Sequence, residues 1–109
     1  MASIVKPEVT LGGYMAKHGR AAAFNGSDGQ AYSVGIFTED EPSATGQYGA
    51  ALLFIRWSPA GTSAVGHVET EYLAWGPTRG DAEERIKALS LFDVKSALDE
   101  AIAKAPGEW

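Results

Sequence analysis

Apolar side chains recur at every second position through much of the region between residues 20 and 76, which is the period of a β-strand. Glycine, proline and asparagine interrupt this pattern and mark the turns. The strongest turn lies at 25–29, where an Asn-Gly step and an Asp-Gly step suit a tight hairpin. The pattern therefore predicts an antiparallel meander of four strands, at 21–24, 30–38, 49–57 and 66–75.

The third predicted strand is apolar on both of its sides. One side would present Ala51, Leu53, Ile55 and Trp57, and the other Ala50, Leu52 and Phe54, with Arg56 as the single charged residue. A strand of this kind is expected to be covered on both sides, because apolar surface left in water is unfavourable. What covers the second side becomes the main functional question.

After the last predicted strand, the apolar period changes to about 3.6 residues, the period of an α-helix. Asp81 is expected to cap a first helix. The apolar stripes of 82–89 and 91–105 lie about 150° apart, which is too far for one straight helix to bury both. Ser90 stands between them and is expected to cap a second helix that ends before Pro106.

The first nineteen residues contain several breakers, among them Pro7 and the Gly12-Gly13 pair. We expect an N-terminal arm at 1–19, with room for one edge strand, ahead of a single domain at 20–109. The predicted fold class is α+β, an antiparallel four-stranded β-meander followed by two C-terminal helices packed on one face.

Composition narrows the function classes. The chain has 109 residues, which is enough for one domain, and a formal net charge of -5. A nucleic-acid partner is not expected, because no cationic surplus is present to meet phosphates. With no cysteine, disulfides, thiolate metal sites and thiol nucleophiles are excluded. No apolar run reaches the length of a membrane span, so a soluble, cytoplasmic protein without a membrane partner is expected.

His67, Glu69 and Glu71 are spaced so that a regular strand would point all three side chains the same way. An imidazole with two carboxylates suits a divalent cation or general acid–base chemistry, which makes these residues the candidate catalytic set. The competing interpretation is an ordinary charged strand face, and it is favoured several-fold because nothing local marks a buried carboxylate. We therefore predict no metal site and no cofactor.

The aromatic residues Trp57, Tyr72 and Trp75 are the candidate ligand-binding residues. Core packing explains most aromatic side chains on strands, and a small-molecule pocket walled by two or three rings is the functional alternative.

Two short helices can cover one face of a four-stranded sheet but not both. The second face is expected to meet either the N-terminal arm or a second copy of the chain, with Leu52, Phe54 and Arg56 as the candidate interface. The leading hypothesis is a non-catalytic binding module that works as a homodimer. Its uncovered sheet surface or its acidic loop at 39–47 would meet an unknown protein or small molecule. The alternative is a small enzyme or ligand-binding protein, with or without a divalent metal, whose pocket lies between sheet and helices and uses the candidate catalytic set.

Overall fold

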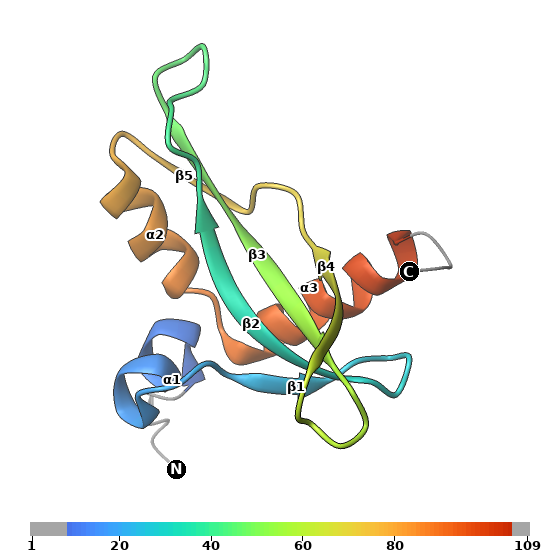
Figure 1. The fold of residues 1–109 in the computed structure, drawn as a ribbon. Coiled ribbons are helices and arrows are strands. Elements are labelled where there is room, and N and C mark those ends of the chain that lie inside the picture. Colours follow the sequence, from blue (N-terminus) through green and yellow to red (C-terminus); the bar gives the residue numbers. More distant parts are fainter. Residues whose placement is uncertain (1–8, 106–109) are drawn as a thin grey trace.

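One antiparallel sheet forms the centre of the computed structural model, which describes residues 9–105. Four strands follow one another across this sheet in chain order, as the meander prediction required (Figure 1). They are β1 (Ala23–Asn25), β2 (Ala31–Thr38), β3 (Tyr48–Trp57) and β4 (Ala64–Glu69). The predicted α+β class is confirmed.

The strand predicted at 66–75 is in fact two strands, and the prediction of one continuous strand was wrong. After β4 the chain leaves the sheet and returns as β5 (Ala74–Gly76), which also pairs with β3. Between the pairs Phe54–Val68 and Ala50–Ala74, β3 advances four residues while its partner advances six. The two additional residues loop out of the sheet edge, so side chains in 70–73 do not keep a simple alternation.

Thr70 gives a local reason for this break. Its hydroxyl accepts a hydrogen bond from the backbone N–H of Leu52 at 3.0 Å and donates one to the carbonyl of Glu71 at 2.7 Å. The side chain thus takes the place of a backbone acceptor in the strand ladder, and regular pairing stops there.

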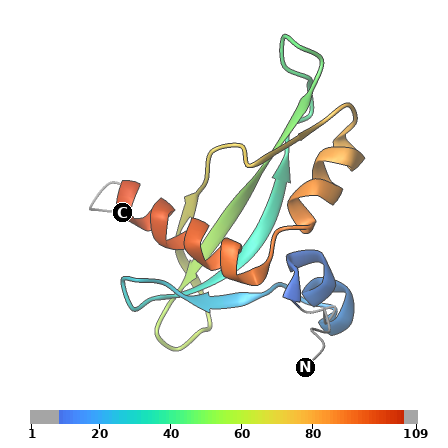
Figure 2. The same cartoon turned by 180° about the vertical axis from the view of Figure 1, so that it is seen from behind.

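Two helices, α2 (Arg79–Lys87) and α3 (Leu91–Lys104), lie on one face of the sheet (Figure 2). Ser90 caps α3 as predicted, since its hydroxyl accepts a hydrogen bond from the N–H of Asp93 at 3.0 Å. Asp81 does not cap α2. Thr78 does so instead, accepting from the N–H of Asp81 at 3.0 Å, and the helix begins three residues earlier than expected.

A third helix, α1 (Leu11–His18), replaces the edge strand that was expected in the N-terminal arm. Thr10 caps it by accepting a hydrogen bond from the N–H of Gly13 at 3.0 Å, and Gly19 ends it with a left-handed backbone. Leu11 is fully buried in the hydrophobic core, which fixes α1 beside α2. Residues 1–8 of the predicted arm lie outside the described part of the chain.

The hydrophobic core lies between the sheet and the helices. Its sheet side consists of alternating residues of β2, β3 and β4, and its helix side of the buried stripes of α2 and α3. The fully or almost fully buried side chains include Tyr32, Val34, Leu52, Phe54, Val68, Ile86, Val94 and Leu98.

We call the opposite side of the sheet the open face. It carries the other alternating set of β2 and β3 and continues onto β4 and β5: Ala31, Ser33, Gly35, Phe37, Gly49, Ala51, Leu53, Ile55, Trp57, His67, Glu69 and Trp75. Figure 1 looks onto this face, with α2 and α3 behind the sheet, while α1 lies beside the sheet in both views (Figures 1 and 2). None of the three described helices covers it.

Candidate functional site

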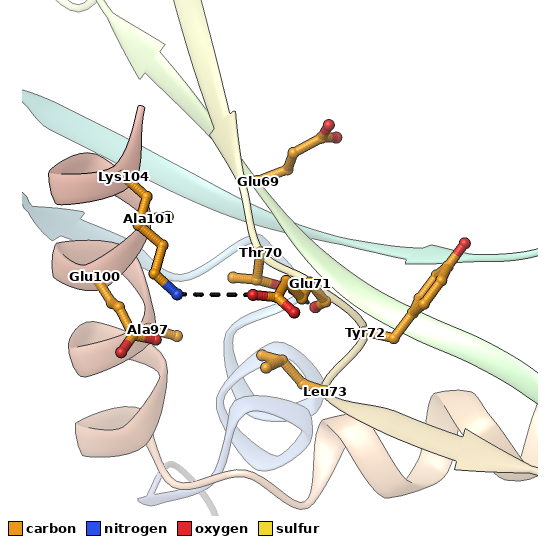
Figure 3. Close-up of a pocket in the computed structure, with 9 residues that line it drawn as sticks. All are labelled: Glu69, Thr70, Glu71, Tyr72, Leu73, Ala97, Glu100, Ala101 and Lys104. Carbon is orange, nitrogen blue, oxygen red and sulfur yellow. Dashed lines mark hydrogen bonds and ion pairs between the residues drawn. The ribbon is translucent and has the colours of Figure 1, made fainter. Parts of the chain in front are cut away.

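The structure divides the candidate catalytic set between two sides of the sheet edge. His67 lies opposite Ile55 and Glu69 opposite Leu53, so both belong to the open face. Glu71 follows the end of β4 and turns toward α3, where its carboxylate lies 3.6 Å from the Lys104 amine (Figure 3). Because the strand ends at Glu69, the alternation that would have aligned all three does not reach Glu71. Within residues 9–105, no group of three or more histidine and carboxylate side chains could hold a metal ion.

A pocket lies between the sheet edge and α3, with a lining that differs from the one that the alternative hypothesis named. It has a volume of about 270 Å³ and is lined by Glu69, Thr70, Glu71, Tyr72, Leu73, Ala97, Glu100, Ala101 and Lys104 (Figure 3). His67 and the tryptophans Trp57 and Trp75 are not part of it. The ion pair across it joins two largely exposed side chains, so it contributes little to stability.

The three candidate ligand-binding aromatics do not form one group. Trp57 lies at one end of β3, where its indole N–H donates a hydrogen bond to the hydroxyl of Ser33 at 2.9 Å. Trp75 lies opposite Gly49 at the other end. Eight residues of extended strand separate these positions, a distance of about 26 Å.

Tyr72 and Trp75, by contrast, are in direct contact. Their ring centroids are 5.0 Å apart and the ring planes meet at 63°, an edge-to-face arrangement. The Tyr72 hydroxyl donates a hydrogen bond to the carboxylate of Glu39, which raises the pKa of this phenol above its usual value. Tyr72 therefore stays in its neutral, donating form at neutral pH.

These two rings line a second, larger pocket on the open face, with a volume of about 580 Å³. The other lining residues are Phe37, Glu39, Ala51, Glu69, Thr70 and Glu71. Sequence reasoning missed the contributions of Phe37 and Glu39. Phe37 was detectable as the one large apolar residue on its side of the predicted strand, whereas Glu39 carried no signal because it lies in a loop that the pattern marked only as acidic.

Two of the three candidate interface residues lie in the core. Leu52 and Phe54 have no exposed area, because α2 and α3 pack over their side of the sheet. Arg56 lies on the same side, paired with Tyr32 of β2. A partner approaching the sheet would instead meet the alternate set of β3, which includes Leu53, Ile55 and Trp57.

Among the described helices, none is long and apolar enough to cross a membrane. No protein-family model matches this chain. The searches of curated proteins and of solved structures also find no match.

Proposed function

We propose that this chain is a non-catalytic interaction module that forms a homodimer through its open face. The observation that carries the proposal is the composition of β3 on that face, where Leu53, Ile55 and Trp57 follow one another at alternate positions with no described helix over them. Apolar surface of this kind usually marks a site of association. The divergence of Glu71 from His67 and Glu69 supports the non-catalytic part of the proposal.

The distribution of charge favours a second copy of the chain as the occupant. The protein carries a net charge of -5, so two copies repel one another over most of their surfaces. The β2 and β3 positions of the open face form the exception, because they hold only apolar, glycine and serine residues: Ala31, Ser33, Gly35, Phe37, Gly49, Ala51, Leu53, Ile55 and Trp57. A two-fold axis through this region would bring uncharged surface against uncharged surface.

The size of the face is sufficient for a dimer of moderate affinity. At the usual strand rise and spacing, the length of β3 and the width of four strands give about 500 Å² per copy, or about 1,000 Å² in total. Specific protein interfaces begin at about this area. Small residues at the centre, Gly35 and Ala51, allow two sheets to approach face to face.

The test is the oligomeric state as a function of concentration, measured by sedimentation velocity. We expect a dimer at high micromolar concentration that dissociates on dilution. Ile55→Glu should give a monomer at every concentration, since it places a charge in the centre of the interface. The matched control is Phe92→Glu, which makes the same kind of change at a side chain of α3 that is 78% exposed and away from the sheet face.

Each outcome of this test decides the proposal. Loss of the dimer in Ile55→Glu but not in Phe92→Glu supports it. A wild-type monomer at all concentrations, or a dimer that only Phe92→Glu disrupts, contradicts it.

A cytoplasmic location is also proposed, since a chain without cysteine needs no oxidising compartment.

A further inference from the structure

We propose that the larger pocket on the open face binds a trimethylammonium group. The proposal concerns the same face as the proposed dimer, but it uses residues of one chain and does not require self-association. We call the three rings of this pocket, Phe37, Tyr72 and Trp75, the aromatic corner. All three are exposed, at 48%, 40% and 40%, although they are large apolar side chains that could have been buried in the core.

The backbone and its neighbours hold the aromatic corner in place. Tyr72 lies over Gly49, and a Cβ at Gly49 would come within 2.8 Å of the tyrosine ring, so only glycine lets the ring lie against β3. The Tyr72 hydroxyl is bonded to Glu39, and the carbonyl of Trp75 accepts a hydrogen bond from the Arg85 guanidinium of α2. The site is therefore formed before a ligand arrives, which lowers the entropic cost of binding.

The arrangement of the rings gives the site its walls. The planes of the Tyr72 and Trp75 rings meet at 63°, so the two side chains form two sides of a corner. Phe37 lies beside Ala51 as its cross-strand neighbour, and the small alanine leaves the floor of the pocket open. Where a ring of this site turns its face to the pocket, the negative potential of that face favours a cation as the occupant.

The charges around the aromatic corner also favour a cation. Three carboxylates line the pocket, those of Glu39, Glu69 and Glu71, and no lysine, arginine or histidine lines it. Glu71 faces away toward Lys104, but Glu69 points to the other side of the strand (Figure 3). Among the described residues, the carboxylate of Glu69 has no ion-pair or hydrogen-bond partner.

Two arginines that lie outside the lining are already engaged. The Arg85 guanidinium donates a hydrogen bond to the carbonyl of Trp75. Arg79 donates a hydrogen bond to the carbonyl of Thr38 at 3.3 Å and lies 3.2 Å from the carboxylate of Asp40, so its charge is directed to that loop carboxylate. The pocket therefore retains a net negative potential within a chain that is acidic overall.

A trimethylammonium group fits these features better than a primary amine does. Its charge is spread over methyl groups, it is weakly hydrated, and it has no N–H donors that would be left without acceptors against aromatic walls. A primary ammonium would lose strong hydration on entering the aromatic corner and would prefer the exposed carboxylates at the rim. The site should therefore discriminate by methylation.

The probe for the test is tetramethylammonium chloride, titrated into the full chain by calorimetry and by NMR. We expect a dissociation constant on the order of 1 mM, reasonable for so small a ligand. The uncharged analogue 2,2-dimethylpropan-1-ol, which keeps a tert-butyl group but carries no charge, and the ammonium ion should each bind at least about tenfold more weakly. Equal binding of the uncharged analogue, or no binding of tetramethylammonium at tens of millimolar, would overturn the proposal.

Variants locate the binding to this pocket. Trp75→Ala should weaken binding about tenfold. Phe37→Ala changes a second exposed ring, so that the test does not depend on one variant, and it should weaken binding to the same extent. Glu69→Gln should weaken it severalfold, whereas Glu84→Gln, an identical charge change on the exposed side of α2, should not. Unchanged affinity in Trp75→Ala, Phe37→Ala and Glu69→Gln together would place the binding elsewhere and overturn the assignment.

The remaining arms separate the two proposals and the two sources of the ligand group. Ile55→Glu should retain tetramethylammonium binding, so failure of the dimer and failure of this site are observed independently. Choline carries the trimethylammonium group on a free small molecule, and N-acetyl-trimethyllysine amide represents the same group on a protein side chain. At least one of the two is expected to bind more tightly than tetramethylammonium. The tighter one shows whether the natural ligand is a small molecule or a protein side chain. Weaker binding of both would overturn the proposal.

Discussion

The carboxylate of Asp99, in the third turn of α3, accepts a hydrogen bond from the backbone N–H of Ser27 at 2.9 Å. Ser27 belongs to the hairpin turn between β1 and β2, so this bond joins the C-terminal helix to the first hairpin. Asp99 is also 2.6 Å from the amine of Lys95, one turn earlier on the same helix. The two donors together hold the pKa of Asp99 below its usual value, the Lys95 hydrogen bond being the larger cause.

This relationship predicts a pH-dependent contribution to stability. A carboxyl group with a lowered pKa in the folded state stabilises the fold at neutral pH and loses that effect as the pH falls through its folded-state pKa. Asp99→Ala should therefore lower the free energy of unfolding by about 1 kcal/mol at pH 7. The difference from the wild type should shrink below pH 4. Urea unfolding at both pH values measures it, with Glu100→Ala as the control on the same helix; a difference that persists at low pH contradicts the prediction.

Two adjacent leucines on β3 should differ in how much their replacement by alanine lowers the free energy of unfolding. Leu52 is fully buried beneath the helices, whereas Leu53 lies on the open face and is partly exposed. Leu52→Ala should lower the free energy of unfolding by about 3 kcal/mol, because it leaves a cavity in the core. Leu53→Ala should cost about 1 kcal/mol in the monomer. Denaturant unfolding at low concentration tests this pair, and equal losses would mean that the two faces are equally covered.

The helix α1 shows where sequence patterns are insufficient. Its caps, Thr10 and Gly19, are typical of helix ends, but Gly12 and Gly13 suggested a broken segment instead. The structure explains Gly12 by a tertiary contact: a Cβ there would lie 2.8 Å from the Cβ of Lys87 on α2. A glycine that permits close helix packing has the same letter as a glycine that breaks a helix, so the sequence alone could not distinguish them.

The candidate site could not be predicted from the sequence for a similar reason. Alternation along β2 and β3 correctly predicted the meander, and the helical period of the C-terminal segment correctly predicted the break at Ser90. Both features depend on local pattern and on one buried face. The aromatic corner depends on the two additional residues that loop out between β4 and β5. They bring Tyr72 over Gly49 and turn Glu71 away from Glu69, and no period in the sequence encodes such an irregularity.

Gly26 predicts a steric effect in the first hairpin. Its backbone angle is not in the left-handed region, which is occupied in this turn by Gly29 with φ of 80°. Space is the constraint, since a Cβ at Gly26 would lie 2.5 Å from Cδ1 of Ile102 and 2.8 Å from the buried ring of Tyr32.

Gly26→Ala should therefore lower the free energy of unfolding by about 1 to 3 kcal/mol, the usual cost of overpacking. Gly35→Ala is the matched control, because its Cβ would have its nearest neighbour at 3.7 Å and fit without a shift. Thermal unfolding of both variants compares them. A larger loss in Gly35→Ala would show that the turn is not packed against α3.

Ser90 separates α2 from α3 and predicts a measurable cap. Its hydroxyl accepts from the N–H of Asp93, and its carbonyl accepts from the N–H of Val94 at 2.9 Å. Ser90→Ala should lower the free energy of unfolding by about 1 kcal/mol. Ser96→Ala, at an exposed position of the same helix, should have little effect because it removes no cap. If the two variants unfold alike in urea, the hydroxyl of Ser90 does not stabilise α3.

Tyr32 predicts a loss of stability at high pH. Burial of its phenol and the hydrogen bond that it donates to Asp28 at 2.7 Å raise its pKa from 10.0 to about 12. A group whose pKa is raised on folding stabilises the fold fully below its unfolded-state pKa and loses that contribution as the pH rises. The free energy of unfolding should thus decline between pH 10 and about 12 as this phenol is forced to ionise.

Ultraviolet titration of the phenolate absorbance checks this directly. Four tyrosines titrate in the unfolded chain, and in the folded chain one step should lie near pH 12. Tyr32→Phe should remove that step and flatten the decline in stability. Tyr14→Phe also removes one phenol, but it should leave the step near pH 12 and the decline in stability unchanged. If the step near pH 12 persists in Tyr32→Phe, it belongs to another tyrosine, and the assignment of the raised pKa to the buried phenol of Tyr32 is wrong.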